Sequence, residues 1–307
     1  MQRAHHQIEQ ERRFPLLGGS IEIVLYDVDP GVAAILFEEI YQEGLRLQSI
    51  FNFFDPQSEL SLLNQQRIRT VSAELLEVLT VALRYCRETG GRYDISKGRE
   101  ILLRKRRRQQ PRAAPTSNYT ANYTAISFHG NTVRLQHPSV CIDLGSIAKG
   151  YIVDKLLEFI SQQGILSAFI DARGDMRITG QHLEIVEIQH PRKKGGFQAL
   201  LLENKAVATS GDYSQYYGTP ETSHLVGTVY ASSVTVLADT LMEADVLATC
   251  ASLLPLEEAR ALIENHTAAA LIVDKQGGIH ETTQFPRYTL TEEPRFVRRQ
   301  GVVRGEA

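Results

Sequence analysis

The sequence predicts an α+β fold, in which mixed β-sheets pack with helices in two intertwined lobes. Short segments such as Leu183–Gln189 alternate apolar and polar residues, the pattern of a half-buried strand. Other segments place apolar residues at helical spacing, as Val32, Ile35 and Leu36 do. With 307 residues, the chain can bury a substantial core in one large or two ordinary domains.

The expected elements of the first half are bounded by turn and capping residues. Proline suits the first helical position, serine suits an N-cap, and a Gly-Gly pair ends a helix. The expected elements are a strand at residues 20–26, a helix opened by Pro30, a short helix capped by Ser58, a helix over residues 72–89, and a hairpin within residues 123–135.

The second half alternates short strands with further helices. Thr240 and Glu243 fit a capping box, which places a helix start at Thr240. The expected elements are a helix that continues to about Gln162, strands at residues 167–171, 183–189, 200–209, 234–237 and 268–273, and a helix at residues 256–265.

Composition excludes several functional classes. A formal net charge of −3 is too small to indicate nucleic acid or an acidic substrate as partner. The three cysteines, Cys86, Cys141 and Cys250, lie far apart in apolar runs, which favours core positions over metal or redox sites. No signal peptide is visible, and no apolar run approaches the roughly 20 residues that span a bilayer. We therefore expect a cytoplasmic protein without a membrane anchor.

The one strong run of charge covers residues 104–108, Arg-Lys-Arg-Arg-Arg. Such a run can form a nucleic-acid or membrane patch. Because Pro111 and Pro115 follow closely, a solvated loop is the favoured interpretation.

The segment from Ile142 to Asp154 reads as a strand end, a glycine turn and a helix start, with Lys149 at the start of the helix. Backbone N–H groups, a positive helix end and a mobile cation are the parts needed to hold a phosphate. Taken alone, an ordinary strand–helix connection is the favoured alternative.

Asp245 and Thr249 are four residues apart and share one face of the expected helix. A carboxylate and a hydroxyl offer two hard oxygens, which suit magnesium or calcium better than zinc. On spacing alone, a polar helix face without a metal is the favoured interpretation.

Aromatic and histidine residues give weaker signals. Phe51, Phe53 and Phe54 more often belong to a core than to a platform for a planar ligand, although stacking stays open. His224 follows a group of tyrosines, and a lone histidine is usually structural.

Several short motifs follow one another along the chain in a fixed order. They are Ser58-Glu59-Leu60-Ser61 with Asn64, Tyr93-Asp94 through Gly98, the 142–154 segment, Gly174-Asp175, residues 208–213, His224, and Met242-Glu243-Ala244-Asp245 with Thr249. This series resembles the ApbE family of FAD:protein FMN transferases over about residues 16–275. Its most specific pieces are the Asp-Leu-Gly-x-Ile-Ala-Lys-Gly-Tyr, Ala-Thr-Ser-Gly-Asp-Tyr and Met-Glu-Ala-Asp segments.

The resemblance implies an enzyme that uses FAD as substrate and Mg²⁺ as cofactor. Family members move FMN from FAD onto a threonine hydroxyl of an acceptor protein, such as a redox subunit of a sodium-pumping quinone reductase, and release AMP. The FAD would lie in a cleft between the two lobes. The implied partner is an acceptor protein with a flavinylated threonine, and neither nucleic acid nor a membrane anchor is expected.

The resemblance also implies roles for individual residues. The metal would be held by the carbonyl of Ala148 together with Asp245 and Thr249. Lys149 would lie near the FAD phosphates, and His224 would stand close to the reacting centre, so the expected catalytic residues are His224, Lys149 and Asp245. The residues expected to line the flavin nucleotide are Phe54, Ser58, Glu59, Asp94, Gly98, Lys149, Gly174, Asp175, Ser210 and Gly211.

The implied chemistry is physically sensible. Breaking a pyrophosphate places negative charge on the departing AMP, and one magnesium ion with a cation such as Lys149 can stabilise that charge by several kcal/mol. The attacking threonine must lose a proton, which a carboxylate or His224 could accept. The sequence leaves this choice open.

At several positions the sequence departs from the family pattern. Arg173 and Ser146 stand where members usually have glycine, and the loop after His224 is shortened. Leu17 replaces a usual methionine, and Phe54 stands where tyrosine is frequent. Because the expected metal residues are kept, we expect FAD and metal binding to be retained. Two alternatives stay open: an FAD pyrophosphatase that releases FMN and AMP, and an FAD-binding protein without turnover.

The expected organisation has three parts. They are a polar N-terminal extension over residues 1–15, an ApbE-like flavin transferase domain over residues 16–280, and an extended C-terminal tail over residues 281–307.

Overall fold

A large antiparallel sheet packed with helices confirms the α+β class. The structure is a computed structural model of the 307-residue chain, and it describes residues 9–102, 122–192, 195–211, 227–290 and 301–303. Each strand of the large sheet is antiparallel to its neighbours. In order across the sheet, the strands are β1 (Glu9–Leu16), β2 (Gly19–Tyr26), β6 (Ala168–Ala172), β7 (Asp175–Thr179), β10 (Ala206–Gly211), β11 (Ala231–Ala238), β12 (Ala269–Asp274) and β13 (Ile279–Glu281).

Two smaller sheets make the strand arrangement mixed, as expected. In one of them β14 lies parallel to β8, whereas β8 and β9 are antiparallel. The strands of this sheet are β14 (Gly301–Val303), β8 (Leu183–Gln189) and β9 (Gly196–Glu203). The other small sheet contains β3 (Ile68–Thr70), β5 (Thr132–Leu135) and β4 (Ile126–His129), in that order.

Four of the helices begin at a residue whose side chain caps them. Asp29, Ser58, Ser72 and Thr240 each accept a hydrogen bond from a backbone N–H of the first turn. No helix among the described residues is long and apolar enough to cross a membrane. The helices are α1 (Pro30–Phe51), α2 (Glu59–Gln66), α3 (Ala73–Glu88), α5 (Ala148–Gln162), α6 (Leu241–Ser252) and α7 (Leu256–Asn265), with short 3-10 turns η1 (Tyr123–Ala125) and η4 (Phe285–Tyr288).

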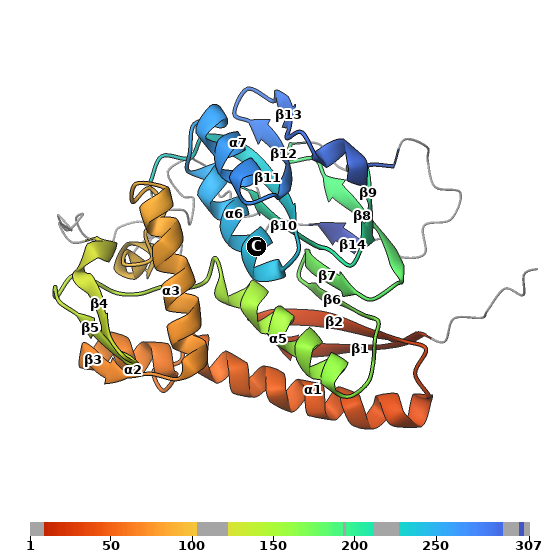
Figure 1. The fold of residues 1–307 in the computed structure, drawn as a ribbon, viewed down its shortest axis with the longest axis horizontal. Helices are drawn as coiled ribbons and strands as arrows, with labels where there is room; N and C mark the ends of the chain where they lie inside the picture. The colour runs from red at the N-terminus through yellow and green to blue at the C-terminus, as the bar shows by residue number, and fades with distance from the viewer. Residues whose placement is uncertain (1–8, 103–121, 193–194, 212–226, 291–300, 304–307) are drawn as a thin grey trace, which may run out of the picture.

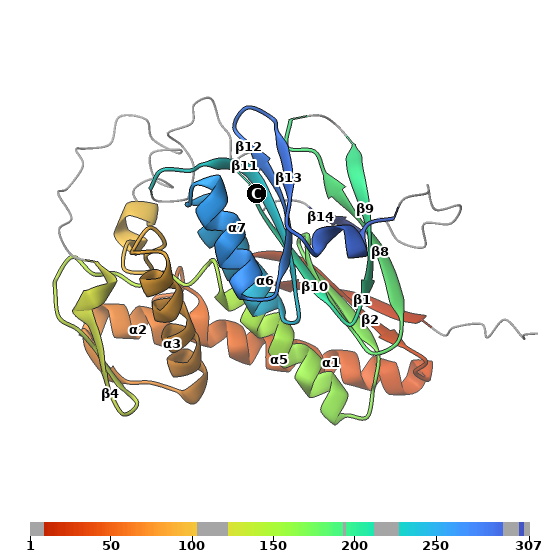
Figure 2. The same cartoon turned by 45° about the horizontal axis from the view of Figure 1, so that its top comes forward.

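Two apolar cores lie on opposite faces of the large sheet. Successive residues of a strand point to opposite faces, so Ile23 belongs to one core and Val24 to the other. The larger core joins the sheet to α1, α3, α5, α6 and α7. The smaller core joins it to β8, β9 and Phe285 of η4. Figure 2 accordingly shows α6 and α7 on one side of β10–β12 and β8 and β9 on the other.

The chain builds two intertwined lobes. After α1 it leaves the large sheet, forms α2, α3 and the sheet β3–β5–β4, and then returns through α5 to β6. Figure 1 shows this second lobe beside α6 and α7, with α1 running beneath both lobes. The start of α5 is therefore the point where the chain passes from one lobe to the other.

Several strands differ from the sequence expectation. Residues 200–209 were expected as one strand, which is wrong: β9 and β10 are separated at Asn204, whose φ of 47° breaks the extended backbone. Strands β1, β3, β7, β13 and β14 were not predicted. Strand β1 takes up residues 9–15 of the expected N-terminal extension, and Phe285 in the expected tail is fully buried.

Candidate active site

The start of α5 packs against α6 and β7. Its N-cap residue, Ile147, makes no side-chain capping bond, so its own side chain does not close the helix start. The Gly150 N–H donates to Oδ2 of Asp245 on α6 over 3.4 Å. Figure 1 shows the first turn of α6 lying over the first turns of α5. A helix start of this kind, with a lysine in its first turn, is suited to binding an anion.

Lys149 and Asp175 form a buried ion pair. Their side chains are 7% and 3% exposed, and Nζ of Lys149 contacts Oδ2 of Asp175. The other carboxylate oxygen, Oδ1, accepts the Thr209 N–H over 3.0 Å. Buried charges need close pairing and further hydrogen bonds to offset their lost hydration, and Asp175 has both. The pair therefore ties α5 to β7 and β10 and brings the expected residues Lys149 and Asp175 together.

The tight turn between β6 and β7 presents Gly174 next to this pair. Arg173 and Gly174 have φ values of 66° and 98°, and the Gly174 N–H donates to Oδ1 of Asp171 over 2.6 Å. Burial raises the pKa of Asp171 to about 6, since the hydrogen bond from Gly174 only partly offsets it and the charge of Asp175 adds to the rise. A carboxyl group that titrates near neutral pH thus lies beside the ion pair.

Ser210 and Gly211 end β10 immediately after Thr209, the residue that donates to Asp175. They pair with Val234 and Ser233 of β11, which fixes their register in the sheet. The predictions for His224 and for Asp212 and Tyr213 of the 208–213 motif fall outside the described residues.

Asp245 and Thr249 occupy successive turns of α6, and both are 7% exposed. Ala148 opens α5 two residues before Gly150, the residue that donates to Asp245. Within the described part of the chain, no three His, Cys, Asp or Glu side chains gather as metal ligands. A cation here would therefore depend on carbonyl and hydroxyl oxygens beside the Asp245 carboxylate, a donor set that fits a hard cation such as Mg²⁺.

The side chains of Ser58 and Glu59 cap helices. The Ser58 hydroxyl accepts the Ser61 N–H over 3.1 Å at the start of α2. The Glu59 carboxylate accepts the backbone N–H and the hydroxyl of Ser72 over 2.6 and 2.7 Å, just before α3. Ser58 thus caps α2, as its position in the sequence predicts, and Glu59 joins the start of α2 to the start of α3.

The second lobe contributes three of the expected nucleotide residues, Asp94, Gly98 and Phe54. Asp94 accepts the Ser96 N–H over 2.9 Å, and its side chain is 1% exposed. Gly98 donates its N–H to the Cys141 carbonyl over 2.8 Å, and a Cβ there would lie 3.1 Å from the Phe53 ring. Phe54 is 62% exposed, so its ring is not a core residue.

The 93–98 turn lies directly against the segment that leads into α5. The hydroxyl groups of Tyr93 and Ser146 are hydrogen-bonded over 3.0 Å, and the Asp143 N–H donates to the Ile95 carbonyl over 2.9 Å. The two groups of expected nucleotide residues, one on each lobe, therefore adjoin at residues 141–149.

The sequence analysis assigned no role at the site to three residues of this region: Asp154, Arg177 and Thr209. Asp154 accepts hydrogen bonds from the Leu241 and Met242 N–H groups, and it pairs with Arg177. The available signal was the alternation in Asp175-Met-Arg-Ile-Thr179, which marks a strand with Asp175 and Arg177 on one face.

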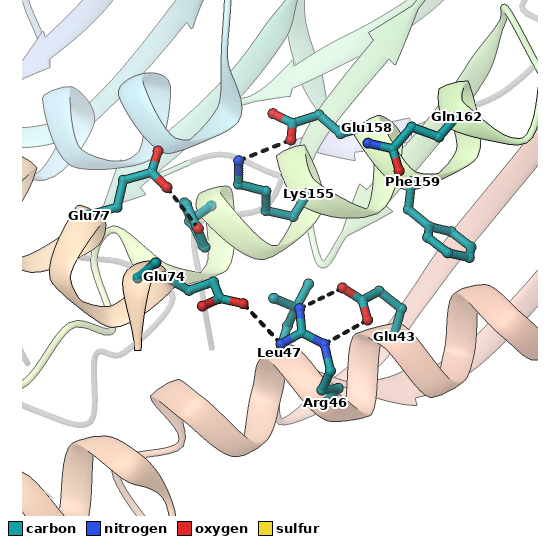
Figure 3. Close-up of a pocket in the computed structure, with 11 residues that line it drawn as sticks. Glu43, Arg46, Leu47, Glu74, Glu77, Lys155, Glu158, Phe159 and Gln162 are labelled. Atoms are coloured by element: carbon teal, nitrogen blue, oxygen red, sulfur yellow. Dashed lines mark hydrogen bonds and ion pairs between the residues drawn. The ribbon is translucent and has the colours of Figure 1, made fainter. Parts of the chain in front are cut away.

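A separate cavity of about 290 Å³ lies between α1, α3 and α5. Figure 3 shows Arg46 held between Glu43 and Glu74, and Lys155 paired with Glu158. None of the residues expected at the active site lines this cavity.

Comparison with known proteins identifies relatives of this chain. Residues 17–272 match the ApbE family. A Haemophilus influenzae protein named FAD:protein FMN transferase is 30% identical over 276 residues, which cover 77% of this chain and 78% of that protein. A Vibrio cholerae protein of the same name is 28% identical over 295 residues, 87% of this chain and 88% of its own.

Solved structures share the fold. The ApbE protein of Thermotoga maritima superposes with a TM-score of 0.80 at 24% identity, covering 92% of this chain and 100% of that one. The flavin transferase ApbE of Vibrio cholerae gives a TM-score of 0.76 at 23% identity, covering 92% and 99%. The sequence match over most of the chain and the shared fold lead to one conclusion: this chain belongs to the ApbE family.

Proposed function

We propose that this chain transfers FMN from FAD to a threonine hydroxyl of an acceptor protein, releases AMP, and uses Mg²⁺ as cofactor. Family membership and the names of the curated relatives support the transferase class. The observation that carries the proposal is the meeting of Lys149, Asp175 and Asp245 at the start of α5.

In the proposed reaction, the threonine oxygen forms a bond to the FMN phosphorus and the phosphorus–oxygen bond to AMP breaks. AMP leaves with the electron pair of that bond, and the hydroxyl proton passes to a carboxylate or to His224. Lys149 would stabilise the negative charge that builds up on the phosphates, an effect of several kcal/mol in a water-poor site. Asp175 would hold the Lys149 ammonium in place, since the two form a buried pair.

The Ala148 carbonyl, the Asp245 carboxylate and the Thr249 hydroxyl would hold the Mg²⁺ ion. When bound there, the ion would act as a Lewis acid on the phosphate oxygens. The burial of Asp245 and Thr249 on one helix face, beside the first turn of α5, supports this assignment.

The remaining residues would form the walls of the nucleotide site. The exposed Phe54 ring would stack on a planar part of the nucleotide, and Gly98, Gly174 and Gly211 would allow close backbone approach. Asp94 and Ser210 would line the nucleotide with polar groups. Ser58 and Glu59 would act by holding α2 and α3 in place, because Ser58 caps α2 and Glu59 binds Ser72, the N-cap residue of α3.

Incubation of the purified chain with FAD and MgCl₂ tests the proposal. The acceptor probe is the apo form of a redox subunit of a sodium-pumping quinone reductase. We expect AMP release that requires the acceptor, and covalent flavin fluorescence on the acceptor that a threonine-to-alanine change abolishes. AMP without acceptor would indicate FAD hydrolysis instead, and no AMP under either condition would overturn the proposed activity.

Asp245→Asn tests the metal assignment within the same assay. We expect AMP release to fall at least about a hundredfold, because the substitution removes the only carboxylate of the expected donor set. Asp239→Asn is a matched control, since Asp239 lies just before α6 with its side chain 76% exposed. If Asp245→Asn retained full activity, the metal assignment would be wrong.

A further inference from the structure

The first turn of α6 packs against α5 without an intervening side chain. A Cβ at Gly150 would lie 2.5 Å from the Met242 nitrogen, closer than real Cβ contacts allow. The start of α6 is thus held within backbone contact of the first turn of α5. Such a close approach needs a specific set of bonds, because polar backbone groups are buried at both helix starts.

Asp154 supplies these bonds one turn further along α5. Its Oδ1 accepts the Leu241 N–H and its Oδ2 accepts the Met242 N–H, each over 2.9 Å. The next two N–H groups of α6 donate to the hydroxyl and the carbonyl of Thr240. The Ala244 bond is the first i→i−4 bond of the helix, so the unsatisfied N–H groups of the first three helical residues are all accounted for, and Asp154 accepts two of the three.

A counter-charge from β7 keeps the Asp154 carboxylate in its place. The Arg177 guanidinium donates to Oδ1 of Asp154, whose side chain is 8% exposed. Asp175 and Arg177 are two residues apart on β7 and share one face of the strand. Two ion pairs, Lys149–Asp175 and Asp154–Arg177, thus join α5 to strand β7.

The consequence concerns Asp245, which lies one helical turn after Leu241. Its carboxylate accepts the Gly150 N–H over 3.4 Å, so its place depends on how α6 sits on α5. We propose that Asp154 is a positioning residue of the cation site: it fixes the start of α6 on α5 and thereby holds Asp245 and Thr249 at the first turn of α5. This inference rests on the proposed function, because it concerns the Mg²⁺ ion that the function requires.

Asp154→Asn tests the hydrogen bonds of the Asp154 side chain while keeping its volume nearly unchanged. Asparagine has nearly the shape of aspartate but only one acceptor oxygen, so its NH₂ group faces one of the two N–H groups of α6. Asp239→Asn serves as control, because Asp239 pairs with Lys205 at the surface two residues before Leu241.

The experiment is a calorimetric titration of Mg²⁺ into each full-length variant saturated with FAD, together with thermal unfolding without ligand. We expect Asp154→Asn to weaken Mg²⁺ binding at least about tenfold, the usual range for residues that hold metal ligands in place. Asp239→Asn should bind Mg²⁺ as the wild type does. A lowered melting temperature for Asp154→Asn with unchanged Mg²⁺ affinity would overturn the inference, because Asp154 would then be structural only.

Three further cases are decisive. If Asp154→Asn does not fold, Arg177→Gln takes its place: we expect a smaller loss of Mg²⁺ affinity in the same direction, and no loss would overturn the inference. If the wild-type chain transfers flavin but shows no saturable Mg²⁺ binding, the inference fails while the transfer activity stands. If the wild type neither binds Mg²⁺ nor releases AMP, the proposed function fails and the inference with it.

Discussion

The two sides of helix α5 carry charged residues in opposite ways. On the side facing β7 and α6, Lys149 and Asp175 are 7% and 3% exposed and pair with each other. On the side facing α1 and α3, charged residues surround the cavity of Figure 3, where Arg46 is 50% and Glu158 56% exposed. Both sides contain ion pairs, but only the first takes them out of water.

This difference shows which charged residues the fold holds in a fixed arrangement. An exposed ion pair contributes at most about 1 kcal/mol and rearranges freely. A buried pair persists only where the surrounding structure holds it, and such sites are often functional. The cavity of Figure 3 therefore lies on the side of α5 with half-exposed charges, while the candidate chemistry lies on the side with buried ones.

The largest expected effect breaks the buried pair. Lys149→Met leaves the Asp175 carboxylate buried without its counter-charge, so we expect the free energy of unfolding to fall by about 3–5 kcal/mol. Urea unfolding measures the loss. The double variant Lys149→Met/Asp175→Asn should recover much of it, because an asparagine oxygen can still accept the Thr209 N–H. A single variant as stable as the wild type would show that the pair is not buried in solution.

A smaller effect tests the contact between α5 and α6. Gly150→Ala inserts a methyl group against the Leu241–Met242 backbone, which should cost about 1–3 kcal/mol of unfolding free energy. Gly44→Ala in α1 is the matched control, since its Cβ would meet only the movable Leu16 side chain. Equal effects of the two substitutions on unfolding would contradict the close approach of the helices.

His266, at the end of α7, is intermediate in exposure between the buried ion pair and the charged residues around the cavity. Its side chain is 16% exposed and lies between Glu243 of α6 and Glu88 of α3, at 3.2 and 2.8 Å. Tyr85 stacks on its ring, and Arg84 lies beside Glu88 at 3.7 Å. The hydrogen bond with Glu243 raises the pKa of His266 more than partial burial lowers it, and Glu88 adds to the rise.

A raised folded-state pKa stabilises the protein while histidine is protonated. The contribution is complete below the unfolded pKa of about 6.5 and is lost as pH rises through the higher folded-state pKa. We expect His266→Gln to lose about 1 kcal/mol of unfolding free energy near pH 6 and progressively less at higher pH. Urea unfolding over a pH series measures the difference, and a difference independent of pH would rule out this origin.

The smallest effect is expected on the cavity side of α5. Arg46→Met removes the guanidinium from Glu43 and Glu74, but the pairs are half exposed. We expect the free energy of unfolding to change by less than about 1 kcal/mol and AMP release to stay at the wild-type rate. A large loss of transfer activity would show that the cavity, rather than the buried side, belongs to the active site.

Local signals predict most of the helices and few of the sheet contacts. Pro30, Ser58 and Ser72 mark helix starts to within a residue, because capping depends on residues within one turn. Strand pairing is not local: β2 pairs with β6 across more than a hundred residues, so no short pattern contains it. The break at Asn204 was missed although the polar run Glu203-Asn204-Lys205 separates the apolar residues of β9 from those of β10.

The candidate site likewise has parts that local motifs predict and parts that depend on contacts between distant segments. Motif order identifies Lys149, Asp175 and Asp245, and the structure joins Lys149 to Asp175 and the start of α5 to Asp245. The role of Asp154 could not be read from the sequence, since it depends on the N–H groups of a helix 87 residues further along the chain. Metal and nucleotide roles stay predictions for all of these residues.

A crystal structure of the chain with FAD and Mn²⁺ in place of Mg²⁺ tests the central claim most directly, because the anomalous signal of manganese locates the ion. The account predicts one ion on the Ala148 carbonyl, Asp245 and Thr249, with the diphosphate of FAD beside Lys149. An ion bound elsewhere, or FAD seated in the cavity between α1, α3 and α5, would contradict it.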